Sequence, residues 1–270
     1  MHFSSHQPPP ELAPWVRSIW CAGGGKADFG APDPIVPDGC VEIVFNLADP
    51  FADRRGPQPL QLIAGQMTAP VTAVATGSVD LIGVRFRPGR AGAALRTPAG
   101  ELRDRLVDAS AVVGGAGELR AALRHLPRER RLSHLTAVLA RRLGARPMPD
   151  TSTVDHALVL IASQRGNVAI ERVASEVGIT RRHLERRFHE EVGLGAKQLA
   201  RITRVHAVLR ALREQPLSSG AEIAAACGYS DQAHMIRECK ALTGRTPARL
   251  TTSVRSLARL MREAAADRST

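Results

Sequence analysis

Two predicted helices, near residues 181–188 and 232–242, place hydrogen-bonding side chains on outward faces. The outward positions are Arg181, Arg182, Glu185 and Arg186 in the first helix, and Gln232, Ala233, Ile236 and Arg237 in the second. A guanidinium can bridge O6 and N7 of guanine, glutamate can accept from the amino group of cytosine, and glutamine also reads base edges. These residue types are therefore suited to reading DNA in the major groove, and plain solvent exposure is the alternative for each of them.

A helix-turn-helix pattern positions the second set of side chains. A short helix ends at Gly228, and Ser230 or Asp231 can cap the helix that follows. Small and apolar residues then recur at helical spacing, so they face inward and leave the polar positions outward. The inward positions of the two helices are Ile223, Ala224, Cys227, Met235, Cys239 and Leu242.

The same pattern occurs about fifty residues upstream, which makes it an internal repeat. The matching residues of the upstream copy are Val173, Ala174, Val177, Gly178, Leu184, Arg186, Phe188 and Gly193, with Thr180 as a natural helix cap. Between the copies, residues 197–213 are predicted to form one helix with an apolar stripe. At ~1.5 Å per residue this connector spans roughly 25 Å, enough to hold two recognition helices at neighbouring turns of the major groove, which recur about every 34 Å.

These segments closely resemble the two-motif DNA-binding domain of the AraC/XylS family of bacterial transcription regulators. The matching stretches are VASEVGITRRHLERRF, the connector, IAAACGYSDQAHMIRECK and the tail GRTPARL. The resemblance covers somewhat over a third of the chain, and its signature requires both motifs, the connector and the Thr-Pro turn in order. It implies groove contacts for Arg182, Glu185 and Arg186 in the first motif, and for Gln232, Ala233, His234 and Arg237 in the second.

Two positions depart from the family pattern in the second motif. Cys239 stands where phenylalanine is usual, and Ile236 stands where a polar residue is usual. The smaller thiol predicts looser packing, and Ile236 is a candidate contact for a thymine methyl group or for the first domain. The arginine-rich first motif is therefore expected to dominate the affinity for DNA.

The first 110 residues have a β-rich texture. Short runs of β-branched and aromatic residues alternate with turn signals, which predicts a small all-β barrel or sandwich. The expected strands are residues 16–20, 41–47, 60–64, 71–75 and 81–86. The stretches PDGCVEIVFNL and GVRFRPGRAGAAL are similar to the amino-terminal sensing domains of some AraC-type regulators, which are often cupin-like barrels. The expected fold is thus α+β and multidomain, with an all-α double helix-turn-helix domain at the carboxyl end.

Glu42 and Arg85 are the candidate ligand contacts in this domain, with a structural ion pair or solvated charges as the alternative. Cys40 begins a predicted strand and is expected to be packed rather than reactive. A DNA-repair enzyme that accepts alkyl groups on cysteine would need a metal-binding cysteine cluster and a Pro-Cys-His type motif, and neither is present in the sequence. His189-Glu190 resembles the start of a zinc-protease motif, but Gly193 stands at the second ligand position. We expect no catalytic residues, metal or cofactor.

The chain divides into four expected segments. Residues 1–145 form the β-rich sensing and dimerisation domain with trailing helices, and residues 146–152 form a linker. Residues 153–255 form the DNA-binding domain, and residues 256–270 form a basic tail. The helical pattern of residues 100–143 allows packing on the barrel or pairing with a second subunit, and a homodimer is implied by the resemblance alone.

The formal net charge of +11 favours a polyanionic partner or a solvated basic surface. Residues 151–270 carry 19 basic and 12 acidic side chains, against 18 and 14 in residues 1–150, so the excess is larger in the shorter half. Four scattered cysteines without a C-x-x-C pair argue against a disulfide framework or zinc cluster. The sequence shows no signal-peptide or transmembrane pattern, which predicts a cytoplasmic protein without a membrane partner.

These patterns predict a sequence-specific transcription regulator, either an activator or a repressor, that binds double-stranded promoter or operator DNA. A small-molecule effector of unknown identity is expected to bind the amino-terminal domain, and RNA polymerase is a further expected partner. Two alternatives stay open. One is an effector-independent dimeric DNA binder, and the other is a DNA-modification enzyme carried by an AraC-type targeting module.

Overall fold

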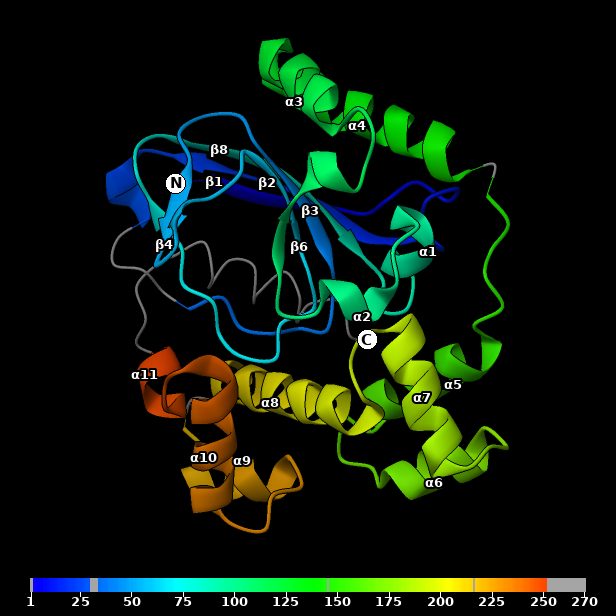
Figure 1. Cartoon of the computed structure of the whole chain (residues 1–270). Coiled ribbons are helices and arrows are strands. Elements are labelled where there is room, and N and C mark those ends of the chain that lie inside the picture. The colour runs from blue at the N-terminus through cyan, green and yellow to red at the C-terminus, as the bar shows by residue number, and fades with distance from the viewer. Residues whose placement is uncertain (1, 30–33, 145, 216, 252–270) are drawn as a thin grey trace.

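The computed structural model describes residues 2–29, 34–144, 146–215 and 217–251. A β-rich amino-terminal domain lies against a helical carboxyl-terminal domain (Figure 1), as the predicted fold class requires. The basic tail predicted for residues 256–270 lies outside the described residues. Within the described part, no helix is both long and apolar enough to cross a membrane.

The amino-terminal domain contains two antiparallel sheets. The larger has the strand order β1 (His2–His6), β2 (Val16–Gly24), β8 (Val79–Phe86), β3 (Glu42–Asn46), β6 (Gln61–Ala64) and β9 (Leu106–Asp108). The smaller has the order β5 (Gly56–Pro57), β4 (Phe51–Asp53) and β7 (Val74–Ala75). Short 3-10 turns occur at η1 (Lys26–Phe29) and η2 (Ala109–Ala111). The five predicted strands are present as β2, β3, β6, β7 and β8.

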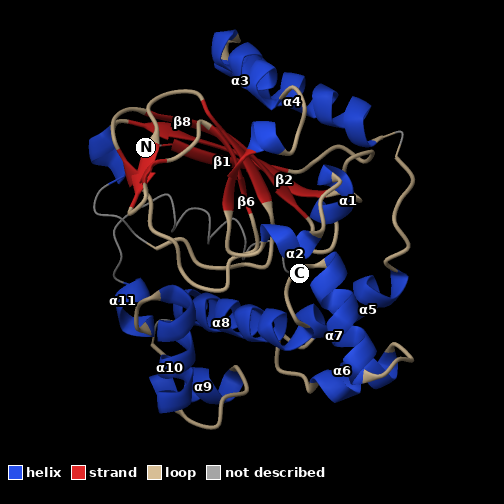
Figure 2. Cartoon of the chain, in the orientation of Figure 1, coloured by secondary structure: helices blue, strands red, loops and turns tan. Residues whose placement is uncertain are grey.

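The central strands β3 and β8 send alternate side chains to opposite faces of the sheet, as the pleat dictates. One face carries Glu42 and Arg85, which lie directly opposite each other in the register. The other face packs its apolar side chains against α1 (Ala91–Leu95), α3 (Ala116–His125) and α4 (Arg128–Leu143). Figure 2 shows α3 and α4 on one side of the sheet and the helical domain on the other. The trailing helices therefore pack on the sheet, the first of their two expected arrangements.

The carboxyl-terminal domain is entirely helical. Its helices are α5 (Ser152–Ser163), α6 (Ile170–Glu176), α7 (Arg181–Glu191), α8 (Ala196–Glu214), α9 (Gly220–Ala226), α10 (Gln232–Thr243) and α11 (Pro247–Thr251). The α6–α7 and α9–α10 pairs are the two predicted helix-turn-helix motifs, and α8 is the predicted connector. Residues predicted to face inward are buried, including Leu184, Phe188, Met235 and Cys239. One continuous core joins both motifs to α8.

Local sequence signals fix the ends of the motif helices. The Thr180 hydroxyl accepts from the His183 backbone N–H at 3.2 Å at the start of α7. Asp231 accepts from the His234 backbone N–H at 2.6 Å at the start of α10, and Ser219 forms a capping box before α9. Both turns use a glycine with φ of +72°, Gly178 and Gly228, because other residues rarely adopt that conformation. The repeat in sequence is thus a repeat in backbone geometry.

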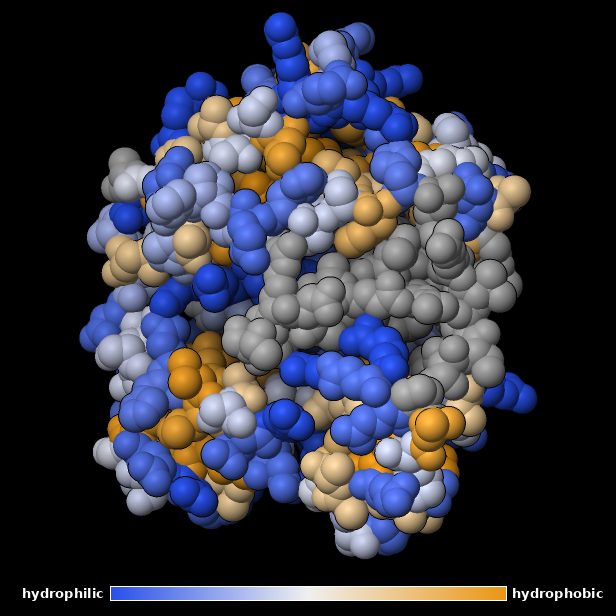
Figure 3. Space-filling view, turned by 180° about the vertical axis from the view of Figure 1, so that it is seen from behind, coloured by the Kyte–Doolittle hydropathy of each residue, from blue (hydrophilic) through white to orange (hydrophobic). Residues whose placement is uncertain are grey.

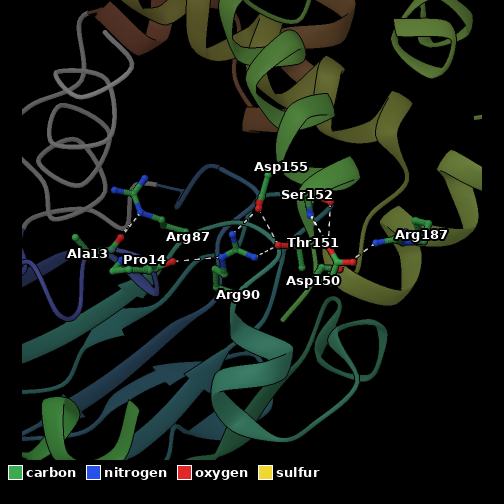
Figure 4. A network of polar contacts seen from close by, with 9 residues as sticks. All are labelled: Ala13, Pro14, Arg87, Arg90, Asp150, Thr151, Ser152, Asp155 and Arg187. Carbon is green, nitrogen blue, oxygen red and sulfur yellow. Dashed lines mark hydrogen bonds and ion pairs between the residues drawn. The ribbon is translucent and has the colours of Figure 1, made fainter. Parts of the chain in front are cut away.

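Polar contacts dock the two domains around the start of α5 (Figure 4). Arg90 precedes α1 and reaches across to Thr151 and Asp155, with 2.6 Å between Arg90 Nη2 and Asp155 Oδ2. Arg187 in α7 donates to the backbone oxygen of Asp150 at 3.3 Å. The segment that joins the domains is therefore anchored on both sides. A short α2 (Ala99–Leu102) extends the contact to α7.

Candidate nucleic-acid interface

The two motifs lie at opposite ends of α8. Figure 1 shows α6 and α7 at one end and α9 and α10 at the other, and Figure 3 shows two separate lobes at the bottom of the molecule. A helix of 19 residues is about 28 Å long, comparable to the separation of roughly 34 Å between successive major-groove segments on one side of B-DNA. The connector therefore has the length needed to present both α7 and α10 to one duplex.

The outward face of α7 carries three arginines in different environments. Arg182 is exposed, and within the described residues its side chain makes no hydrogen bond or ion pair. Arg186 has a 63% exposed side chain that lies 3.4 Å from Glu190 one turn later, and Arg181 pairs with Glu171 of α6. Exposed ion pairs contribute little to stability, so these guanidinium groups can exchange a carboxylate for a base or phosphate at small cost.

Glu185 is held by the fold itself. Its side chain is half-buried, and Oε2 accepts from the Ala196 backbone N–H at 3.1 Å, at the first turn of α8. A carboxylate is favourable at a helix N-terminus, where backbone N–H groups lack partners. Glu185 therefore braces α7 against the connector, and a base contact by this carboxylate would compete with that bond.

The outward face of α10 presents Gln232, Ala233 and Arg237, all of them exposed. His234 is half-buried, because its ring packs edge-on against Tyr229 at 5.2 Å between centroids and its Nδ1 lies 3.2 Å from the Ser230 hydroxyl. Among the residues that the structure describes, the side chains of Gln232 and Arg237 have no hydrogen bond or ion pair, whereas His234 contacts residues of the turn.

Glu238 is a buried charged residue that the sequence patterns did not single out. Its carboxylate pairs with two arginines of α8, at 2.8 Å from Arg201 Nε and 3.1 Å from Arg204 Nη2, and it accepts from the Tyr229 hydroxyl at 2.7 Å. Burial opposes the charge on Glu238, but these three donors hold its pKa below the ordinary value. The sequence feature that could have identified Glu238 is its position three residues after Met235, beside the inward face of α10.

This network fixes the recognition helix of the second motif to the connector. The Arg204 guanidinium also stacks over the Tyr229 ring at 4.5 Å from its centroid, which adds a cation–π contact. Because the carboxylate is buried and three donors share it, the network restrains the angle between α8 and α10 more than an exposed pair would. The orientation of Gln232 and Arg237 therefore depends on Glu238.

Glu42 and Arg85 meet in a buried ion pair on the sheet face opposite α3 and α4. Asp38 joins them, with 3.4 Å between Asp38 Oδ2 and Arg85 Nε. Burial opposes the charge on Arg85, yet the two carboxylates hold its pKa above the ordinary value. Their arrangement corresponds to the structural ion pair given above as the alternative to ligand contact.

Cys40 is buried beside this cluster, as expected from the sequence. Burial and the neighbouring Asp38 raise the pKa of the Cys40 thiol to about 12. The thiolate is the nucleophilic form of cysteine, and this environment disfavours it. Among the residues that the structure describes, no three histidine, cysteine or acidic side chains cluster in a way that could hold a metal ion.

Comparisons with known proteins bear on each part of the chain. A family described as a helix-turn-helix domain matches residues 173–253, and one described as a domain of unknown function matches residues 4–108. The HTH-type transcriptional regulator GlxA of Rhizobium meliloti (strain 1021) is 35% identical over 102 residues, which cover 36% of this chain and 31% of that protein. The chain thus spans about a third of the length of this curated relative.

Two solved structures share a distant likeness. A transcriptional regulator from Chromobacterium violaceum, described as AraC-type, has 23% identity and a TM-score of 0.34 over 41% of this chain and 92% of its own. ToxT from Vibrio cholerae has 8% identity and a TM-score of 0.45 over 83% of this chain and 94% of its own.

The family match covers α6 to α11, and the duplicated motifs, the glycine turns and the connector recur in the geometry of those helices. Residues 173–253 of this chain therefore match the helix-turn-helix domain family, and they resemble the DNA-binding domains of AraC-type regulators.

Proposed function

We propose that this chain is a sequence-specific DNA-binding transcription regulator of the AraC type. The main support for this proposal is that α7 and α10 each have an exposed polar face and lie at the two ends of one connector helix, α8. In this proposal α7 and α10 enter two successive segments of the major groove on one side of the duplex. Basic side chains bind phosphate and supply most of the affinity, while the outward polar groups supply the specificity.

The four strongest base-reading residues in this proposal are Arg182, Arg186, Gln232 and Arg237. Each is exposed, and no hydrogen bond or ion pair in the described part of the chain links any of them to the amino-terminal domain. Ala233 adds a small apolar contact, and His234 and Arg181 stand at the edges of the two faces. Glu185 serves the interface mainly by bracing α7 against α8.

The test is binding to DNA from the promoter regions next to the chain's own coding sequence. Arg186→Ala is expected to weaken binding by about 1–3 kcal/mol, with the loss concentrated at particular base pairs. Arg54→Ala is the matched control, because Arg54 is an exposed arginine of the amino-terminal domain and its removal changes the net charge equally. Quantitative footprinting on DNA with single base-pair substitutions distinguishes a loss of affinity at particular base pairs from a loss that is uniform over all sequences.

A loss at Arg186→Ala that is uniform over all DNA sequences would mark Arg186 as a phosphate contact instead. Equal losses for Arg186→Ala and Arg54→Ala would contradict the proposed recognition face. Binding is also expected to weaken steeply with salt, because each phosphate contact releases condensed counterions.

We further propose that a small-molecule effector binds the amino-terminal domain and controls the regulator. Support comes from its separate core and from the polar anchoring of the segment that joins it to α5. A cytoplasmic location, a homodimer and a contact with RNA polymerase belong to the same proposal and rest on the family resemblance. No catalytic step is assigned, and the buried Cys40 thiol does not favour the DNA-modification alternative.

A further inference from the structure

The hairpin of α3 and α4, residues 116–143, carries the positive charge of the amino-terminal half of the chain. It contains seven arginines against two glutamates, a net charge of +5. The other residues of the range 1–150 carry 11 basic and 12 acidic side chains, a net charge of −1. Seen from behind, hydrophilic residues cover the top of the molecule, where the hairpin lies (Figure 3). The basic excess of this half is therefore concentrated in one pair of helices.

Three of the seven arginines hold the hairpin to the sheet. Arg120 Nε donates to the backbone oxygen of Asn46 at 2.6 Å, and Arg131 Nη1 lies 2.7 Å from Asp80 Oδ2. Arg128 Nη2 lies 3.7 Å from the same carboxylate oxygen. In the described part of the chain, Asp80 is the one carboxylate that pairs with an arginine of the hairpin. Most of the charge of the hairpin is therefore left without a counter-charge.

The remaining four arginines are exposed. Within the described residues, no hydrogen bond or ion pair involves the side chains of Arg124, Arg130, Arg141 and Arg142. Arg130 and Arg141 are three helical turns apart on the outer face of α4, about 16 Å along its axis. The exposed residues between them on that face, Ser133 and Ala137, are small. The outer face of α4 therefore presents two unpaired guanidinium groups in one line.

This surface is charged but has no apolar anchor, which decides the class of partner. Among the described residues the exposed large apolar side chains are Val74, Met148, Val159 and Leu217, and none of them belongs to α3 or α4. Protein interfaces depend on buried aromatic and apolar anchors, and binding in a membrane surface also needs an apolar face. A second copy of the chain would bring like charges together. The DNA backbone, by contrast, is bound by arginine and lysine through charge alone.

The hairpin faces away from the two helix-turn-helix motifs. Figure 2 shows α3 and α4 on one side of the sheet and the helical domain on the other. A straight duplex that lies along α7 and α10 therefore runs past the opposite end of the molecule. DNA bound at the hairpin would have to be a different stretch.

We propose that the outer face of α3 and α4 binds the backbone of a second duplex segment, so that one chain bridges two stretches of DNA. The four exposed arginines of the hairpin donate to phosphate oxygens, which guanidinium groups bind well. Phosphate contacts carry no sequence information, so this second segment is bound whatever its base sequence. That the first segment is read by α7 and α10 rests on the proposed function, whereas the contact of the hairpin with DNA does not.

The test is a bridging assay with the full chain. A promoter duplex is fixed to beads, the chain is added at fewer molecules than binding sites, and retention of a fluorescent duplex of unrelated sequence is measured. The wild type is expected to retain the second duplex. The double variant Arg130→Gln and Arg141→Gln is expected to retain several-fold less, with a salt dependence whose log–log slope is smaller by about 2.

The matched control is the double variant Arg54→Gln and Arg55→Gln. It removes the same charge from exposed positions in the turn between β4 and β5, and it should retain the second duplex as the wild type does. Light scattering compares the oligomeric state of all three proteins. A change of that state in the Arg130/Arg141 variant would make the hairpin a subunit interface and would overturn the proposal.

Equal retention by the wild type and the Arg130/Arg141 variant would also overturn the proposal, and so would no retention by the wild type. Fluorescent polyglutamate is the second probe. If the wild type retains polyglutamate but no second duplex, the hairpin binds acidic protein surfaces and the DNA contact is wrong. Preference for promoter over unrelated DNA on the beads is measured in parallel, and its absence with intact bridging would count only against the proposed function.

Discussion

At the residue scale, one carboxylate connects the second recognition helix to the connector. Glu238 has a 6% exposed side chain and lies within reach of Arg201, Arg204 and Tyr229, so removing its charge leaves the two guanidinium groups without their counter-charge. Losing one partner of such a network costs more than losing an exposed pair. Glu238 is thus a positioning residue for the face that carries Gln232 and Arg237.

Replacing Glu238 by glutamine is expected to destabilise the chain by about 2–3 kcal/mol near neutral pH. The measurement is the free energy of unfolding in urea. Glu190→Gln is the control, because Glu190 forms an exposed pair within α7 and its loss should cost well under 1 kcal/mol, as exposed pairs do. Similar losses for the two variants would contradict the bracing role of Glu238.

The same carboxylate predicts a pH dependence. The pKa of Glu238 is lower in the folded chain than its ordinary value of 4.5, so its contribution is present above that value and is lost as pH falls through the folded pKa. The difference in unfolding free energy between wild type and Glu238→Gln should therefore narrow as the solution is acidified below pH 4.5. A difference that stays constant into that acidic range would mean that the Glu238 charge contributes no stability.

At the element scale, the connector lies close to the turn that ends α5. Gly166 has φ of +76°, and a Cβ there would collide with the backbone oxygen of Ala200 and the backbone nitrogen of Arg204 in α8. Gly178 has a nearly identical φ of +72°, but no atom lies within 4 Å of the place that its Cβ would occupy. The two glycines share a backbone requirement and differ in packing.

Gly166→Ala is expected to destabilise the chain more than Gly178→Ala does. Both substitutions place a side chain in the left-handed region, which costs about 1–2 kcal/mol, and Gly166→Ala adds the displacement of α8. Thermal unfolding of the two variants compares them directly. If the two variants lose the same stability, the close approach of α8 to Gly166 adds nothing to the cost of placing alanine in the left-handed conformation.

The helical half of the molecule was largely predictable from sequence, because its signals are local. Caps at Thr180 and Asp231, glycine turns and helical apolar spacing act within a few residues of each other, and they fixed both motifs and α8. The strands β1 and β9 were missed, because HFSSH and LVD depend on distant partners in the sheet rather than on their own composition.

The candidate DNA-contacting site was predictable only where its features depend on local sequence. Exposure of Arg182, Arg186, Gln232 and Arg237 follows from helical periodicity, whereas the half-burial of Glu185 follows from its bond to a different helix. Whether the outward residues contact bases stays a prediction.

At the scale of the whole molecule, the β-rich domain docks along the connector. The Nε2 atom of His206 in α8 lies 2.7 Å from the backbone oxygen of Pro37, and Gly39 lies so close to Leu199 that a Cβ there would collide with it. At the other end Gln66 donates to the backbone oxygen of Val192, just after α7. The docked domain therefore restrains the connector and the first motif together.

Docking is expected to weaken in mild acid. Burial lowers the pKa of His206 below its ordinary value of 6.5, against the opposing effects of the Pro37 oxygen and Asp38, while Arg17 and Arg85 lower it further. His206 therefore binds a proton at a higher pH when the domains are undocked than when they are docked. Docking weakens as the pH falls below 6.5, because protonation favours the undocked state. His206→Gln keeps a donor for Pro37 and should remove this dependence.

Hydrogen exchange of residues 37–41, compared between wild type and His206→Gln at about pH 7.5 and about pH 5.5, measures the effect. Comparison at each pH cancels the intrinsic pH dependence of exchange. His156→Gln is the control, because His156 is exposed on α5. If residues 37–41 lose the same protection in acid in the wild type and in His206→Gln, His206 has no role in docking.

The central claim is that α7 and α10 read one duplex from the two ends of α8. Chemical footprinting of the full chain on its promoter DNA tests it most directly, together with the Arg186→Ala and Arg237→Ala variants. We expect two protected major-groove segments on one side of the DNA, about 10 base pairs apart, and each variant should weaken the protection of only one of them. A single protected segment weakened by both variants would contradict it.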